Sequence, residues 1–280
     1  MISDEELLLL GKRGFIPGPN EDENSFLERV EFSQKPLNNC FTASGERPPF
    51  PLDNKVDPQD WSWASEQLKH FYDVNPLWAH AFYHKKKLLP WQAGMTWIIE
   101  LAEGKKKFTL IQLRKKSLFC SKDELLAHEG AHAARSAYNE PKFEEFFAYF
   151  LSSKSFRKVF GPIVQKPYEA VVFVLLVLVG FWGELLFSSS LVFTFLKLGA
   201  LIWVSLGLFR LARYRFAFNR TYKKVSKSIS DPKKVLAVLF RLTDDEIFYF
   251  NSLNTNEIRE YASRLKKVSL RWRMIFLTYF

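Results

Sequence analysis

The segment SKDELLAHEGAHAARSAY, residues 121–138, places an HExxH motif at 128–132 inside a predicted helix. Ser121 followed by Glu124 forms a capping box, a common start of a helix. The leucines and alanines that follow continue the helix to the end of the segment without a breaker. Motif and helix therefore coincide.

Histidines four positions apart lie on one face of a helix. His128 and His132 can therefore reach a single metal ion, and Glu129 projects beside it. Zinc in a catalytic site takes three protein ligands and keeps a fourth position for a water whose pKa it lowers to about 7. The motif predicts a zinc hydrolase with Glu129 as the general base. The alternative is a pair of surface histidines on an amphipathic helix.

A third ligand is expected from a second helix. The turn at 139–141 ends in a proline, which is favoured at the first position of a new helix. If this helix folds back antiparallel, Glu145 comes level with His132. A stripe of four phenylalanines slightly favours Glu144, whereas Ala148, three positions after Glu145, permits close approach of the two helices. We expect Glu145 to be the ligand and keep Glu144 as the alternative.

The HExxH motif at 128–132, followed by Glu145 and Ala148, resembles the gluzincins, the thermolysin-like zinc metallopeptidases. The resemblance covers about residues 95–151 and implies that Glu145 is the third zinc ligand. It also implies a peptide or protein substrate. The chain departs from the family in the short interval between motif and ligand, and in Tyr149, which stands where many members have an acid. The short interval implies a minimal version of the fold.

The segment before the motif predicts a β-hairpin, with strands at Met95–Ala102 and Phe108–Leu113 joined by the turn at 103–107. In gluzincins such an edge strand flanks the metal and binds the substrate peptide as an added strand, and the resemblance implies the same here. An ordinary hairpin that only packs on the helix is the alternative.

Three other residues near the motif are candidates for supporting roles. Arg135 lies three residues after His132 and could stabilise a carboxylate or help to orient the ligands, although a surface arginine is the preferred interpretation. Tyr138 and Tyr149 are candidate donors to the oxyanion of a reacting peptide.

Two apolar runs, at 170–183 and 191–209, flank a serine cluster at 188–190. As helices, the forty residues would extend about 60 Å, twice the roughly 30 Å of a hydrocarbon core, which predicts a transmembrane helical hairpin. Glu184 and Lys197 are its only charged residues and could pair or extend to the interface. A buried hairpin of a soluble protein is the alternative.

The basic residues around these runs predict their orientation. They lie before the first run and after the second, and the connecting turn has none: Lys154, Arg157, Lys158, Lys166, Arg210, Arg213, Arg215, Arg220, Lys223, Lys224 and Lys227. By the positive-inside rule both flanks, and with them the motif and both termini, are expected in the cytoplasm. The acidic N-terminus has no signal-peptide pattern.

Composition agrees with this assignment. The net charge of +10, from 40 basic and 30 acidic residues, is concentrated beside the apolar runs, where basic residues face anionic lipid. No nucleic-acid motif accompanies it, so membrane lipid is the expected partner and nucleic acid is not. Cys40 and Cys120 show no metal-ligand pattern and are expected to be free thiols of a reducing compartment.

The predicted architecture is mainly α (α+β), in four parts. A poorly compact lead-in covers 1–60, a minimal zinc metallopeptidase-like domain 61–166, the transmembrane hairpin 167–212, and a C-terminal cytosolic helical segment 213–280. The last segment is expected to form helices around 233–241, 244–250 and 256–266 and shows no chemistry of its own.

Residues 60–90 are predicted to be helical, which makes His80 and His84 a second pair four positions apart. The three lysines that follow His84 disfavour a bound cation there, so packed or surface histidines are expected.

The sequence as a whole predicts a membrane-anchored, cytosol-facing zinc metallopeptidase. The alternative is a membrane-anchored interaction protein whose HExxH helix is structural or binds zinc without turnover.

Overall fold

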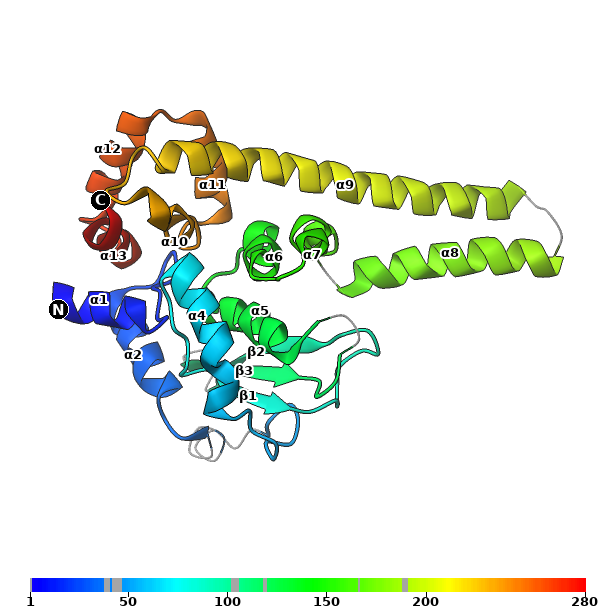
Figure 1. The fold of residues 1–280 in the computed structure, drawn as a ribbon, viewed down its shortest axis with the longest axis horizontal. Coiled ribbons are helices and arrows are strands. Elements are labelled where there is room, and N and C mark those ends of the chain that lie inside the picture. The colour runs from blue at the N-terminus through cyan, green and yellow to red at the C-terminus, as the bar shows by residue number, and fades with distance from the viewer. Residues whose placement is uncertain are drawn as a thin grey trace.

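The structure is a computed structural model that describes residues 2–37, 41, 47–101, 106–117, 120–165, 167–187 and 191–280. Helices dominate these residues and surround one small sheet (Figure 1). The helices, with short 3-10 helices written η, are α1 Asp4–Lys12, α2 Glu23–Ser33, η1 Pro58–Asp60, α4 Trp61–Tyr72, α5 Lys122–Ala134, α6 Pro141–Phe150, α7 Ser155–Phe160, η2 Gly161–Ile163, α8 Pro167–Phe187, α9 Leu191–Val225, η3 Pro232–Lys234, α10 Val235–Leu239, α11 Asp244–Ser252, α12 Thr255–Leu265 and α13 Leu270–Tyr279.

The sheet has the strand order β1-β3-β2, so β2 lies at an edge. Strands β2 (Gly94–Leu101) and β3 (Lys106–Leu113) are antiparallel, with Gly94 opposite Leu113. This confirms the predicted hairpin, although most of its turn lies outside the described residues. Strand β1 (His80–Tyr83) pairs with β3 in parallel.

The prediction that residues 60–90 are all helical was wrong. Helix α4 ends where Asp73 adopts a left-handed conformation (φ 55°), and Pro76 follows soon after. Strand β1 then forms because β3, thirty residues further along the chain, supplies its hydrogen-bonding partner. Such a distant partner overrides local propensity and is invisible in the local pattern. His80 and His84 therefore do not share a helix face.

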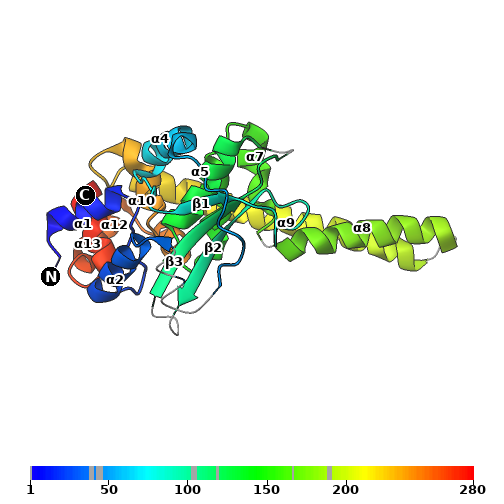
Figure 2. The same cartoon turned by 90° about the horizontal axis from the view of Figure 1, so that it is seen from below.

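The two faces of the sheet are covered by different helices (Figures 1 and 2). Side chains alternate between faces along a strand, so Ile111 and Leu113 of β3 pack in the core formed with α4 and α5. Phe108 and Leu110 point to the opposite face and pack with Phe32 of α2. The motif helix α5 thus rests directly on the sheet, next to edge strand β2.

The N-terminal residues are not the poorly compact lead-in that the sequence suggested. Phe15 and Phe26 are fully buried in a cluster that also contains Met274 of α13. Arg273 of α13 forms an ion pair with Asp4 of α1 at 2.5 Å. The glycine- and proline-rich composition hid this packing because the apolar partners come from the other end of the chain.

The C-terminal helices are part of the same core as the motif helix. Phe240 stacks on Tyr72 of α4 with ring centroids 4.2 Å apart. Helix α11 begins with a reciprocal capping box between Thr243 and Glu246. Helix α13 was not expected from the sequence.

Helices α8 and α9 are both long and apolar enough to cross a membrane. They extend side by side away from the rest of the molecule (Figure 1). Only 11% and 6% of the residues in their most apolar windows are buried, which disfavours the core hairpin of a soluble protein. Glu184 and Lys197 form an ion pair at 2.5 Å, one of the two expected arrangements. Helix α9 continues without a break to Val225, well beyond the apolar run.

Candidate metal centre

Helix α5 carries the HExxH motif and begins as the sequence predicts. The Ser121 hydroxyl accepts a hydrogen bond from the Glu124 N–H at 3.1 Å. The reciprocal half of the capping box is absent, because the buried Glu124 carboxylate accepts hydrogen bonds from Ser153 and Arg157 instead. The helix ends at Ala134, four residues before the expected end.

Gly130, inside the motif, lets α4 approach α5 closely. A Cβ at this position would lie 2.9 Å from Leu68 Cδ1 of α4, tighter than real contacts allow. The close packing buries the back of the motif helix, so the two histidines are held on its opposite side.

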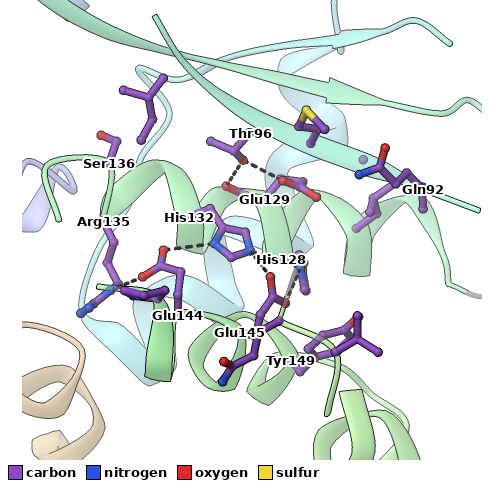
Figure 3. A pocket seen from close by; sticks show the side chains of 18 of the residues that line it. Gln92, Thr96, His128, Glu129, His132, Arg135, Ser136, Glu144, Glu145 and Tyr149 are labelled. Carbon is purple, nitrogen blue, oxygen red and sulfur yellow. Dashed lines mark hydrogen bonds and ion pairs between the residues drawn. The ribbon is translucent and has the colours of Figure 1, made fainter. Parts of the chain in front are cut away.

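Helix α6 begins at Pro141 as expected, and the Asp244 carboxylate accepts hydrogen bonds from the N–H groups of Lys142 and Phe143. One side of α6 buries Phe143 and Phe147 in the core. Glu144 and Glu145 project toward α5 (Figure 3). The helix therefore packs against the core on one side and faces α5 on the other.

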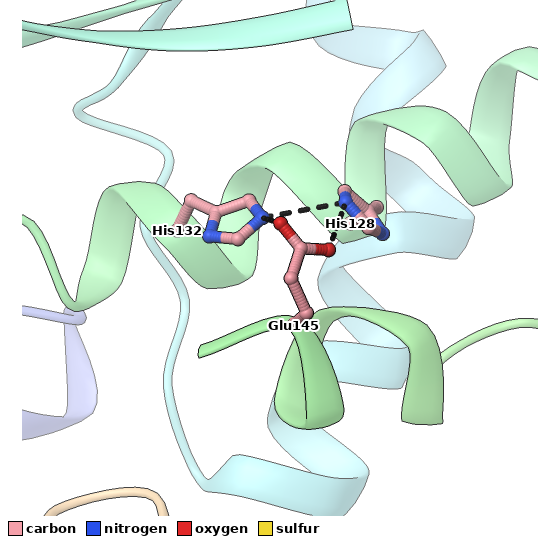
Figure 4. Close-up of side chains that lie close together, drawn as sticks. All are labelled: His128, His132 and Glu145. Atoms are coloured by element: carbon pink, nitrogen blue, oxygen red, sulfur yellow. Dashed lines mark hydrogen bonds and ion pairs between the residues drawn. The ribbon is translucent and has the colours of Figure 1, made fainter. Parts of the chain in front are cut away.

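Three side chains from these two helices converge (Figure 4). His128 Nε2 lies 3.3 Å from His132 Nε2 and 3.6 Å from Glu145 Oε2, and His132 Nε2 lies 3.7 Å from Glu145 Oε1. Tetrahedral zinc with bonds of about 2.1 Å places its ligand atoms about 3.4 Å apart. The donor set, two imidazoles and one carboxylate, and its spacing therefore fit zinc. Within the described residues this is the one group of His, Cys, Asp and Glu with such geometry.

Glu144 does not join the cluster but supports it from behind. Its Oε1 lies 3.1 Å from His132 Nδ1, and its Oε2 accepts a hydrogen bond from Arg135 Nε at 2.8 Å (Figure 3). A carboxylate on the far nitrogen of a histidine fixes the ring orientation and leaves Nε2 as the nitrogen for a metal. Glu144 is therefore in position to orient the His132 ring.

Arg135 is fully buried, so the preferred interpretation as a surface arginine was wrong. It donates to Glu144 and to the main-chain carbonyl of Phe240, and its guanidinium lies over the rings of Tyr138 and Phe147. The local sequence could not indicate this burial, because the carbonyl that Arg135 contacts lies 105 residues further along the chain.

The pKa values of the three clustered side chains shift in different directions. Burial lowers the pKa of His128 well below its usual value, and the charge of His132 adds to this effect. Burial also opposes protonation of His132, but its hydrogen bond to Glu144 and the charges of Glu145 and Glu144 outweigh it and raise the pKa to about 10. Burial raises the pKa of Glu145 to about 7. Without metal the site therefore holds protons that a cation must displace.

Glu129 is buried between α5 and β2. The Thr96 hydroxyl donates to Glu129 Oε2 at 2.7 Å, and burial raises the pKa of the Glu129 carboxyl. Gly94 makes this approach possible, because a Cβ there would lie 2.8 Å from Glu129 Oε1. Neither residue was identified from the sequence, where Thr96 belongs to an ordinary strand pattern and Gly94 directly precedes it.

The cluster lines a cleft of about 620 Å³ between β2, α5 and α6. Every candidate site residue borders this cleft, with different roles. Tyr138 donates its hydroxyl to the carbonyl of Arg241 at 2.9 Å and is buried, so it supports the core and does not fit an oxyanion donor. The Tyr149 ring lies 4.8 Å from the His128 ring, and burial, together with the charge of Glu145, raises its pKa to about 12.

The remaining cysteine and histidine predictions lie outside the cluster. Cys120 is free, as expected, and lies at the cleft wall; Cys40 falls outside the described residues, as does Lys166. His80 is half-buried in β1, and His84 Nδ1 accepts a hydrogen bond from the Lys86 N–H.

Comparison of the chain with protein-family models, with curated proteins and with solved structures gave no match.

Proposed function

We propose that this protein is a membrane-anchored zinc metallopeptidase of minimal gluzincin-like form. One observation carries the proposal. One ligand atom from each of His128, His132 and Glu145 lies within 4.8 Å of the others, close enough to share one metal ion, and the motif's Glu129 borders the same cleft.

Zinc, if held by these three side chains, would act as a Lewis acid toward the scissile carbonyl and would lower the pKa of a bound water. Glu129 takes a proton from the attacking water as the hydroxyl adds to the carbonyl carbon, and it then delivers that proton to the amine nitrogen as the C–N bond breaks. Burial raises the pKa of Glu129 from its usual value toward neutral pH, so the carboxylate accepts a proton more readily. Thr96 holds the carboxylate in place through Oε2.

The substrate chain is expected to bind along β2. This strand lies at the sheet edge, and Gly94, Met95 and Thr96 border the cleft. Main-chain pairing at an edge strand holds an extended peptide with weak sequence preference. Tyr149 is our candidate for the oxyanion donor, because its ring lies next to His128 and its raised pKa keeps the hydroxyl protonated near neutral pH.

Replacement of the base tests the proposal. Glu129→Gln should retain zinc and fold, yet hydrolyse a quenched fluorescent peptide library at least about 100-fold more slowly than wild type, since only the proton-transferring group has changed. Equal hydrolysis by both proteins excludes Glu129 as the base. Bound zinc without hydrolysis in either protein supports the alternative, an interaction protein with a zinc-binding helix.

We further propose that α8 and α9 cross the membrane and that both flanks are cytoplasmic. Basic residues flank the apolar parts of both helices, among them Arg157 before α8, and Arg210 and Arg213 in α9 after its apolar run. Reporter tags at residues 1 and 280 should both be protected from external protease in intact cells. An accessible tag at either end would overturn this orientation.

A further inference from the structure

The cleft that contains the metal cluster continues to the base of helix α8. The same cavity that borders His128 and Glu145 also borders Val164, Gln165 and Ala170. Ala170 is the first residue of the uncharged apolar run of α8. A chain lying in the cleft therefore extends from the metal cluster to the beginning of the helix that we assign to the membrane.

An ion pair marks the level at which the apolar parts of both helices end. Arg210 of α9 contacts Glu169 of α8 at 2.8 Å and donates to the carbonyl of Ile163 at 2.7 Å. Residues of α8 after Glu169 and of α9 before Arg210 form the apolar pair, and Ile163 directly precedes the cleft-lining residues 164 and 165. Since charged residues mark the limit of a hydrocarbon core, this end of the cleft lies at the membrane surface.

Exposed aromatic residues lie on the cleft wall and on helices α7 and α8. Phe156 is 72% exposed, Tyr168 55% and Trp91, on the cleft wall, 48%. Large apolar side chains are seldom so exposed on a surface that faces only water, and aromatic residues are enriched at membrane interfaces. Basic residues alternate with them in α7, including Arg157 and Lys158, as expected next to anionic lipid.

We infer that the cleft takes the juxtamembrane segment of a polypeptide anchored in the same bilayer. Cleavage of the bound segment rests on the proposed peptidase function, whereas binding of the segment does not. A chain that leaves the membrane beside α8 would enter the cleft at Val164 and Ala170 and continue along it to His128. Anchoring in the same bilayer raises the effective concentration of such a chain at the cleft, whereas a soluble chain has no such advantage.

Photocrosslinking of the intact protein in vesicles tests the inference. A photoreactive phenylalanine analogue at Val164 is compared with the same analogue at Leu9, which is exposed on α1 at the far side of the molecule, both in the Glu129→Gln background. The vesicles contain a library of single-span polypeptides whose first ten or so residues outside the membrane are randomised, enough to extend about 35 Å. The matched probe is the same library without the span, at equal total concentration.

The expected result is crosslinking of the anchored library at position 164, at least about tenfold above the soluble library and above position 9. Equal crosslinking of the two libraries, or crosslinking of lipid alone, overturns the inference. The same libraries are then incubated with the wild-type protein. Anchored chains that crosslink but are not cleaved would refute the peptidase function and leave the binding inference standing, so the two failures are distinguishable.

Discussion

The variant Glu144→Gln tests whether Glu144 only orients His132 while Glu145 binds the zinc ion. Glu144 makes two contacts, with His132 Nδ1 at 3.1 Å and with Arg135 Nε at 2.8 Å. Glutamine keeps the shape of the side chain but has one acceptor oxygen, so its NH₂ group must face one of two N–H donors. The variant loses at least one hydrogen bond to a charged group, worth about 1.5–3 kcal/mol.

That loss corresponds to a zinc affinity roughly 10- to 100-fold weaker, the usual effect of removing a partner of a ligating histidine. Titration against a chromophoric chelator measures it on the purified full chain. The variant should still bind one zinc ion per chain, whereas Glu145→Gln, which removes a ligand, should weaken binding beyond this range. Asp245→Asn, an exposed charge on α11, is the control and should bind like wild type. Unchanged affinity in Glu144→Gln, or loss of stoichiometric zinc there but not in Glu145→Gln, would refute this division of roles.

Three further predictions concern the same site. Zinc binding at pH 7 should release about one proton or more, because the pKa of His132 is raised to about 10 and that of Glu145 to about 7. Zinc affinity should therefore rise with pH up to about 10. Calorimetry in buffers of different ionisation enthalpy measures the proton release, and finding none would contradict the prediction. Gly94→Ala should lower kcat/KM about 100-fold while zinc content stays constant, because the added Cβ would lie 2.8 Å from Glu129 Oε1. Gly199→Ala is the control and should change neither, because the atom nearest to its added Cβ is 3.9 Å away. Equal activity of the two variants would show that Gly94 is not needed. Arg135→Met should lower the free energy of unfolding, because it removes the buried arginine partner of the Glu144 carboxylate, and adding Glu144→Gln should recover part of the loss. Additive effects of the two substitutions in urea unfolding would argue against the pair.

Local patterns in the sequence were sufficient for the elements that bear the site. The start of α5, the hairpin β2–β3, the start of α6 at Pro141 and the apolar character of α8 and α9 all follow from periodicity and capping signals within a few residues. The proximity of Glu145 to the two histidines was also anticipated, because two short antiparallel helices leave little freedom in register.

Interactions between distant segments could not be anticipated. Arg135 is buried because its acceptor is the carbonyl of Phe240, and Tyr138 points into the core because its acceptor is the carbonyl of Arg241. Strand β1 depends on β3 in the same way. The orienting role of Glu144 was missed for another reason: it was weighed only as a competitor for the metal, although adjacent carboxylates on one helix can contact the two nitrogens of the same imidazole.

X-ray absorption at the zinc edge, on the full chain loaded with one equivalent of zinc, tests the central claim most directly. A site formed by His128, His132 and Glu145 predicts a first shell of nitrogen and oxygen only, at about 2.0–2.2 Å, with the outer-shell scattering of two imidazoles. Cys120 lies at the wall of the same cleft and offers the obvious competing donor. A sulfur ligand at about 2.3 Å, or a first shell without imidazole, would contradict the account.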